Sequence, residues 1–186
     1  MPTQGPNSAT SVGSVTRGGS DIEWTNPEYA TGSDDDRASV VLVAYELSSF
    51  LWATDFRFTI PRWATVDGIL AEFQVSCPSA IPPFEDIVGI VRSGVQQGST
   101  YETYTSLPAV EAYWEYGGAA DTWNAYMTPW DVNDPTSGLM FGIDRDAGAG
   151  SCTSYVNDIR ETVTYTTHGG PYRRSRRGPC PRGQAR

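Results

Sequence analysis

Residues 66–76 read VDGILAEFQVS, and apolar and polar side chains alternate along this segment. One face of the extended chain carries Ile69, Ala71, Phe73 and Val75. The opposite face carries Leu70, Glu72 and Gln74. Because successive side chains of a β-strand point to opposite faces, this period of two predicts a strand with one face buried in a core.

Five further segments are rich in Val, Thr, Tyr and Phe and predict strands for the same reason. They are residues 39–46, 54–60, 87–91, 139–144 and 155–165. Prolines lie between these segments, where a missing backbone donor does least harm, and no segment keeps an apolar stripe of helical period over three turns. The sequence therefore predicts an all-β fold, an antiparallel β-sandwich that is jelly-roll-like.

Two short helical turns are predicted among the strands. At Thr128-Pro129-Trp130-Asp131, threonine suits the N-cap, proline suits the first helical position and the aspartate completes a pattern like a capping box. A second turn is expected within residues 108–114.

The chain divides by composition into three parts. Residues 1–20 are rich in Pro, Gly, Ser and Thr and contain only Val12 and Val15 as large aliphatic residues, so we expect an extended N-terminal arm. Residues 21–167 form the β-sandwich domain. Residues 168–186 are expected to form an extended, Arg-rich C-terminal tail.

The formal charge of −9 is unevenly distributed, and all 13 basic residues are arginine. Residues 1–167 hold seven arginines and all 22 acidic residues, a charge of −15, and the six arginines after His168 give the tail +6. The acidic body disfavours binding to nucleic acid. The tail by itself has the charge to contact phosphate or an acidic protein surface.

The composition contains few of the residue types that usually serve in catalysis or bind metal ions. The chain has one histidine, His168, beside two glycines, and three scattered cysteines, Cys77, Cys152 and Cys180. We therefore expect no enzymatic activity, no cofactor and no metal centre. The acidic run 34–36 has the oxygen atoms that calcium prefers, but it lacks the spacing of a known calcium loop, so a solvated acidic turn is favoured.

Two groups of residues are candidates for binding a partner. Residues 101–116 are rich in aromatic side chains of the kind that anchor protein interfaces and stack on sugars, and the candidates are Tyr101, Tyr104, Tyr113 and Trp114. Ordinary strand packing is the alternative for this group. In the tail the candidates are Arg173, Arg174, Arg176 and Arg177, whose planar guanidinium groups pair well with carboxylates.

Several segments in a fixed order resemble a recurrent β-sandwich family of tailed bacteriophages. They are residues 24–27 (WTNP), 29–30, 34–36, 51–69, 116–123 (YGGAADTW), 131–133, 141–142 and 156–165. The resemblance extends from about residue 22 to residue 165. It implies a structural protein of the virion, of the kind described as minor tail or head-associated.

The resemblance does not fix the part of the virion. The small size of the chain, the lack of a coiled-coil or fibre repeat and the two expected arms favour a non-enzymatic decoration or cement protein on the outer head surface. Its partners would be the major capsid protein or neighbouring subunits, and a homo-oligomer such as a trimer fits shell symmetry. The first residues, MPTQGP, lack the pattern of a secretory leader and no apolar run is long enough to span a membrane, so assembly into the virion in the host cytoplasm is expected. The alternative is a tail-associated or receptor-binding module that recognises a host glycan or protein.

Overall fold

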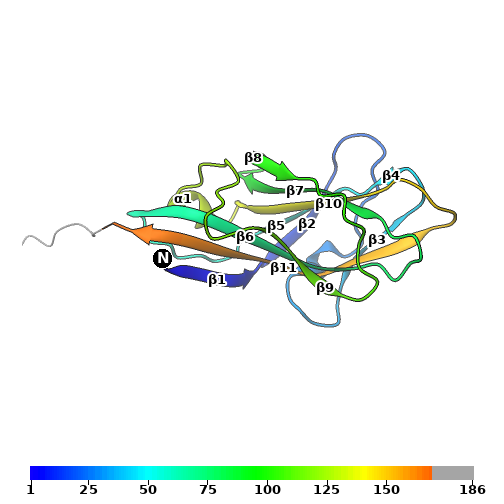
Figure 1. Cartoon of the computed structure of the whole chain (residues 1–186), viewed down its shortest axis with the longest axis horizontal. Coiled ribbons are helices and arrows are strands. Elements are labelled where there is room, and N and C mark those ends of the chain that lie inside the picture. Colours follow the sequence, from blue (N-terminus) through cyan, green and yellow to red (C-terminus); the bar gives the residue numbers. More distant parts are fainter. Residues whose placement is uncertain (169–186) are drawn as a thin grey trace, which may run out of the picture.

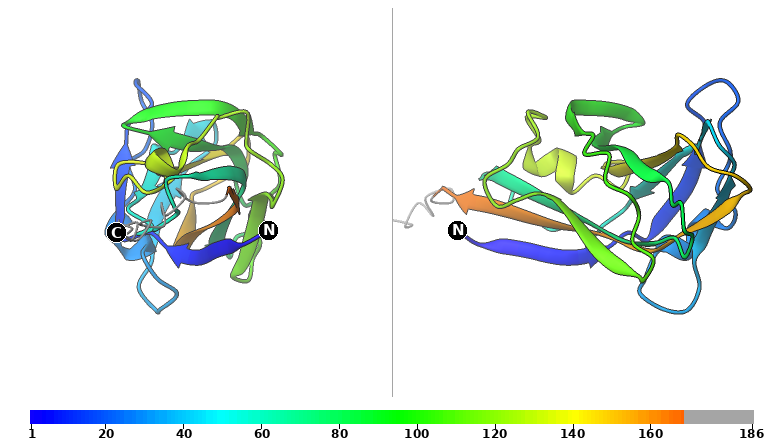
Figure 2. Two further views of the ribbon diagram at one scale, coloured as in Figure 1. Left: turned by 90° about the vertical axis from the view of Figure 1, so that its left-hand side faces the viewer. Right: turned by 45° about the vertical axis from the view of Figure 1, so that its right-hand side comes forward.

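A computed structural model describes residues 1–168 as two antiparallel sheets that pack face to face (Figures 1 and 2). Sheet A contains β1 (Thr3–Ser8), β3 (Ala38–Leu42), β6 (Ala64–Ser76), β9 (Ala112–Gly117) and β11 (Cys152–Thr167). Sheet B contains β2 (Ser11–Val15), β4 (Glu46–Leu47), β5 (Phe50–Thr54), β7 (Phe84–Arg92), β8 (Val95–Tyr101) and β10 (Gly138–Arg145). A 3-10 helix, η1 (Pro27–Ala30), and one α-helical turn, α1 (Pro129–Val132), lie in the connections.

The strand order is that of a jelly roll. Sheet A runs β3-β11-β6-β9, with β1 pairing the other half of β11, and sheet B runs β2-β5-β10-β7-β8, with β4 beside β10. From β3 onward the chain passes repeatedly between the two sheets, as two interlocked Greek keys require. The predicted antiparallel, jelly-roll-like β-sandwich is confirmed.

The core lies between β6 and β11 of sheet A and β10 of sheet B. Phe73 of β6 stacks on Phe141 of β10 with ring centroids 5.0 Å apart, and both side chains are fully buried. Along β6 and β11 the register pairs Val75 with Val156. Alternation along these strands therefore places one apolar face of each in a single core.

The prediction of an extended N-terminal arm is wrong, because residues 1–20 contribute a strand to each sheet. β1 pairs with β11, with Thr3 opposite Thr164, and β2 pairs with β5, with Val12 opposite Ala53. An edge strand is held by main-chain hydrogen bonds and needs few apolar side chains, so the polar composition of this segment concealed it. Ala9 and Val12 are buried.

Two other predicted segments are also corrected. The strand expected over residues 54–60 is absent: β5 covers the preceding residues and ends at Thr54, because Asp55 and Arg57 have positive φ values of 57° and 55°. Beyond Thr54 every second side chain still points into the core, since Phe56 and Phe58 are buried. The strand expected over 39–46 divides into β3 and β4 around a turn at Tyr45, whose φ is +65°.

One of the two predicted helical turns is present. Thr128 caps α1: the Asp131 N–H donates to Thr128 Oγ1 (3.4 Å) and the Thr128 N–H donates to Asp131 Oδ2 (2.8 Å). The turn expected in 108–114 is absent, and residues 112–117 form β9 instead. β9 pairs with β6 over residues 112–117, and Tyr116 packs edge-to-face against Phe73 of the core.

Across residues 1–168, no helix has both the length and the apolarity to cross a membrane.

Candidate functional site

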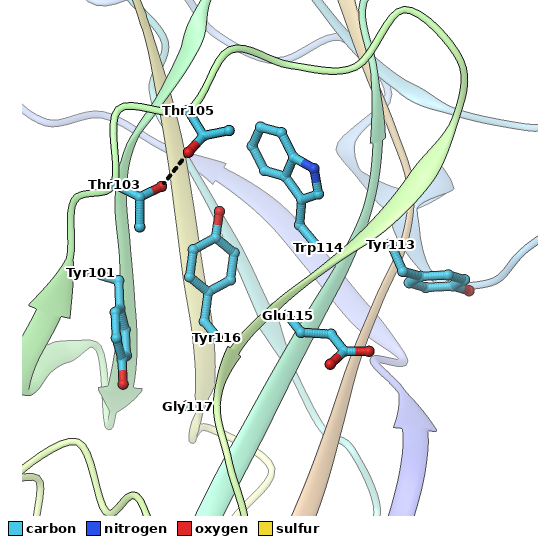
Figure 3. A pocket seen from close by; sticks show the side chains of 8 residues that line it. All are labelled: Tyr101, Thr103, Thr105, Tyr113, Trp114, Glu115, Tyr116 and Gly117. Atoms are coloured by element: carbon cyan, nitrogen blue, oxygen red, sulfur yellow. Dashed lines mark hydrogen bonds between the residues drawn. The ribbon is translucent and has the colours of Figure 1, made fainter.

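An open groove of about 590 Å³ lies between the edge strands of the two sheets (Figure 3). It is lined by Tyr101 at the end of β8, Thr103 and Thr105 in the following connection, and residues 113–117 of β9. β8 is the last strand of sheet B and β9 the last strand of sheet A. The connection between them crosses from one sheet to the other, so the groove occupies one open side of the sandwich.

The pleat of β9 separates the lining residues into two sets. Trp114 lies opposite Phe73, and Tyr116 opposite Ala71, so both point toward the inside of the sandwich. Figure 3 shows Trp114 and Tyr116 on the same side of β9 as Tyr101 and the hydroxyl groups of Thr103 and Thr105. Tyr113 and Glu115 lie on its other side, so the aromatic rings and hydroxyls of the first set face the groove.

Tyr101 is held rigidly at the base of the groove. Its hydroxyl donates to Asp121, and its ring packs edge-to-face on Trp123 with centroids 4.6 Å apart. The Trp123 indole N–H donates to the Ile69 carbonyl (2.9 Å), and the Trp123 backbone N–H donates to Asp121 Oδ1 (2.7 Å). Burial, reinforced by the hydrogen bond to Asp121, raises the pKa of Tyr101 to about 12.

A buried carboxylate, Glu85 of β7, supports the groove from behind Thr103. The Thr103 backbone N–H donates to Glu85 Oε2 (2.9 Å), and the Thr103 hydroxyl donates to the same oxygen. Burial raises the pKa of Glu85 in spite of these two bonds. It also raises the pKa of Tyr116, with a smaller contribution from the Glu85 charge. Glu85, Thr103 and Tyr116 are therefore one polar unit in the groove wall.

The predicted aromatic residues have different surroundings. Tyr101 and Trp114 face the groove, and Tyr113 belongs to the lining segment but has its side chain on the other side of β9. Tyr104 does not line the groove: it is 58% exposed and packs edge-to-face on Phe84, with centroids 5.6 Å apart. The Tyr113 hydroxyl donates to Asp158 (2.8 Å), and the Arg160 guanidinium covers its ring at 3.7 Å. The ring of Trp114 is the better candidate for a free binding surface.

Sequence reasoning missed the polar members of the groove. Thr103, Thr105, Glu85 and Asp121 come from β7 and from two connections, and no local pattern marks them. Their proximity follows from the crossing of the chain between the sheets.

The remaining candidates do not form a site in the described structure. Arg173, Arg174, Arg176 and Arg177 lie outside the described residues. His168 follows the end of β11, and its Nε2 is 2.8 Å from Oγ1 of Thr65 on β6. Within 1–168 no group of three or more His, Cys, Asp or Glu side chains is arranged to hold a metal ion.

Comparison with known proteins finds no matching family model and no matching curated protein. One solved structure that aligns is the second N-terminal cellulose-binding domain of beta-1,4-glucanase C from Cellulomonas fimi. The alignment covers 87% of this chain and 94% of that domain at 14% identity, with a TM-score of 0.43. A likeness of this size supports no inference about ligand or function.

Proposed function

We propose that the chain is a non-catalytic recognition protein of a tailed-phage virion and that its groove binds carbohydrate. The observation that carries the proposal is the placement of Trp114 and Tyr116 beside the hydroxyls of Thr103 and Thr105 on one side of β9. The virion assignment is supported by the resemblance of residues 22–165 to phage β-sandwich proteins.

The chemistry of the groove suits a sugar. A sugar ring presents an apolar face of C–H groups and a rim of hydroxyls that both donate and accept, so it pairs with an aromatic ring flanked by polar groups. Trp114 offers the ring, and Thr103 and Thr105 offer donors and acceptors. The volume of about 590 Å³ lies within the range of ordinary ligand sites.

The arrangement of carboxylates favours binding over hydrolysis. Glycoside hydrolysis uses two carboxyl groups that flank the scissile bond. Here Glu115 lies on the far side of β9 from the aromatic rings, and Glu85 is fully buried behind Thr103. The two do not face one another across the groove.

Replacing Trp114 with alanine is expected to weaken glycan binding at least about tenfold, equivalent to about 1.4 kcal/mol, because the stacking surface is lost. A glycan array with the purified chain identifies the ligand, and calorimetric titration measures the affinity. The matched control is Trp130→Ala on α1. Trp130 is 69% exposed and absent from the groove, so its loss should leave affinity unchanged.

Two results would contradict the proposal: no glycan bound by the wild-type chain, or equal loss of affinity in the Trp114 and Trp130 variants. Thermal unfolding of each variant identifies any change caused by loss of the fold.

We propose a decoration or cement role on the outer head surface as the second candidate. The charge distribution favours it, since a body of −15 and a tail of +6 suit contacts between neighbouring acidic and basic surfaces. β9 also supports it, because among residues 1–168 its sheet contact is with β6 along one edge only. A segment of the capsid protein, or of another copy in a trimer, can add to the other edge.

Deleting residues 168–186 is expected to lower the number of copies attached to purified capsids, because six of the 13 arginines are removed. Quantitative gel analysis of particles mixed with each variant measures the copy number. A second variant separates the effect of the tail's charge from the effect of its length: it keeps the tail but has glutamine in place of Arg173, Arg174, Arg176 and Arg177. Unchanged copy number in both variants would exclude a fastening role for the tail.

A further inference from the structure

The outer face of sheet A contains a buried polar cluster at a β-bulge. The register between β11 and β6 shifts between Val156 and Asp158, so Asn157 is the extra residue, and Asp158 lies opposite Gln74. Segment 31–37 lies against this position: Thr31 forms a bridge with Asp158. A bulge re-aims side chains that would otherwise alternate, and here it leaves both Asn157 and Asp158 only 2% exposed.

Three side chains at the bulge, Gln74, Glu111 and Asn157, are joined by hydrogen bonds, and Asp158 lies opposite Gln74 beside them. We call these four residues the bulge ring. Glu111 Oε1 accepts from Gln74 Nε2 (2.9 Å) and from Asn157 Nδ2 (3.1 Å). Asn157 Nδ2 also donates to the backbone carbonyl of Asp34 (2.8 Å). The ring therefore joins β6, β11, the start of β9 and segment 31–37.

The bulge ring has an excess of acceptor oxygens. Three buried oxygens have no hydrogen-bond donor within residues 1–168: Gln74 Oε1, Asn157 Oδ1 and Asp158 Oδ1. Glu111 Oε2 likewise lacks a hydrogen bond, although Arg37 Nε lies 3.0 Å away. In the described chain the only other buried carboxylate or amide oxygen in this state is Glu85 Oε1. Because buried acceptors are normally satisfied, this concentration points to a missing positive or donating group.

The charges around the ring favour a cation. Asp158 and Glu111 belong to the ring, Glu72 pairs with Arg160 beside it (2.7 Å), and segment 34–36 adds three aspartates. The positive groups that face it are Arg37, 39% exposed and paired with Glu111, and Arg160, stacked on Tyr113. Six carboxylates thus belong to the ring, to its neighbour Glu72 or to the adjoining segment 34–36, against two guanidinium groups.

We propose that the bulge ring binds Ca²⁺. Calcium takes carboxylate and amide oxygens together with water in a flexible shell, and the ring offers four oxygens that lack a hydrogen bond within residues 1–168, two from carboxylates and two from amides. The absence of nitrogen and sulfur ligands disfavours zinc. Arg37 occupies one oxygen of Glu111 and competes with the ion. This site is separate from the groove and does not depend on the proposed function.

Calcium at millimolar concentration is expected to raise the thermal midpoint of the full chain after treatment with EDTA, because the ion binds only the folded state. Asp158→Asn should abolish the rise. Asp146→Asn is the matched control, because Asp146 is exposed and outside the ring, and it should keep the rise. Choline chloride at the same ionic strength should produce none.

A direct measurement of ion binding to the wild-type chain tests the proposal even if the Asp158→Asn variant fails to fold. Terbium luminescence excited through Tyr113, whose hydroxyl contacts Asp158, should appear on titration and be displaced by calcium. Arg37→Gln should tighten calcium binding several-fold, because it removes the competing charge. No midpoint rise and no terbium signal in the wild-type chain would overturn the proposal and leave water as the donor to these oxygens. A rise equal in choline chloride would also overturn it.

Discussion

The wild-type chain is expected to lose a large part of its stability as the pH rises from mildly acidic to alkaline, and replacing Glu161 with glutamine should abolish this loss. Glu161 lies on β11 opposite Ala71 of β6, which places its side chain on the inner face of sheet A, and it is 4% exposed. Burial raises its pKa from 4.5 to about 8. The folded chain therefore keeps this carboxyl protonated at a pH where the unfolded chain has released the proton.

The sign of the effect follows from proton binding. Between about pH 4.5 and 8 the folded state binds more protons at Glu161 than the unfolded state, so the free energy of unfolding falls as pH rises. Each pH unit in this window is worth about 1.4 kcal/mol, and the whole loss is on the order of 5 kcal/mol. That is a large fraction of the stability of a typical domain.

Urea denaturation at pH 5 and pH 9 measures the effect. The free energy of unfolding of Glu161→Gln minus that of wild type should be larger at pH 9 than at pH 5 by several kcal/mol. Glu115→Gln is the control, because Glu115 is exposed on β9, and its difference from wild type should be the same at both pH values. A constant difference for the Glu161 variant would refute the buried, protonated carboxyl.

Trp123→Ala is expected to lower the free energy of unfolding by about 3–5 kcal/mol, as for other large aromatic residues removed from a core. The side chain is 2% exposed, packs on Tyr101 and donates to the Ile69 carbonyl. Its loss leaves a cavity and removes one of the two donors to the Ile69 carbonyl, which keeps the Gly118 N–H. Because Trp123 supports Tyr101, glycan affinity should fall in the same variant under conditions where it remains folded.

Urea denaturation at neutral pH measures this prediction. Trp63→Ala is the control, since Trp63 is 44% exposed, and it should cost less than about 1 kcal/mol. Equal costs for the two tryptophans would show that Trp123 is not a core residue. Unchanged glycan affinity in a folded Trp123 variant would show that the groove does not depend on it.

The parts of the fold that were predicted from sequence are those whose signal is local. β6 and β11 alternate over many residues because each has one face in the core, and the cap at Thr128 depends on residues only three positions apart. β1, β2 and β8 escaped prediction because they are edge strands of polar composition. Their stability comes from backbone pairing with a partner distant in sequence, which no local window contains.

The sequence predicted no groove, but it marked three residues of the segments that line it. Tyr101, Tyr113 and Trp114 stood out as an aromatic cluster within a short segment. Glu85 and Asp121 could not be associated with them, because their contacts with Thr103 and Tyr101 form only when β7 and the 118–128 connection are brought beside the groove.

The amino-acid sequence by itself determined the all-β class and the division of charge, because strand alternation and residue counts need no knowledge of contacts. Only the tertiary structure decided which of these residues lie together. The crossing from sheet B to sheet A assembles the groove, and a single extra residue at Asn157 turns two side chains to the same face of β11. Both depend on register between strands far apart in the chain, and register is set by packing of the whole sandwich.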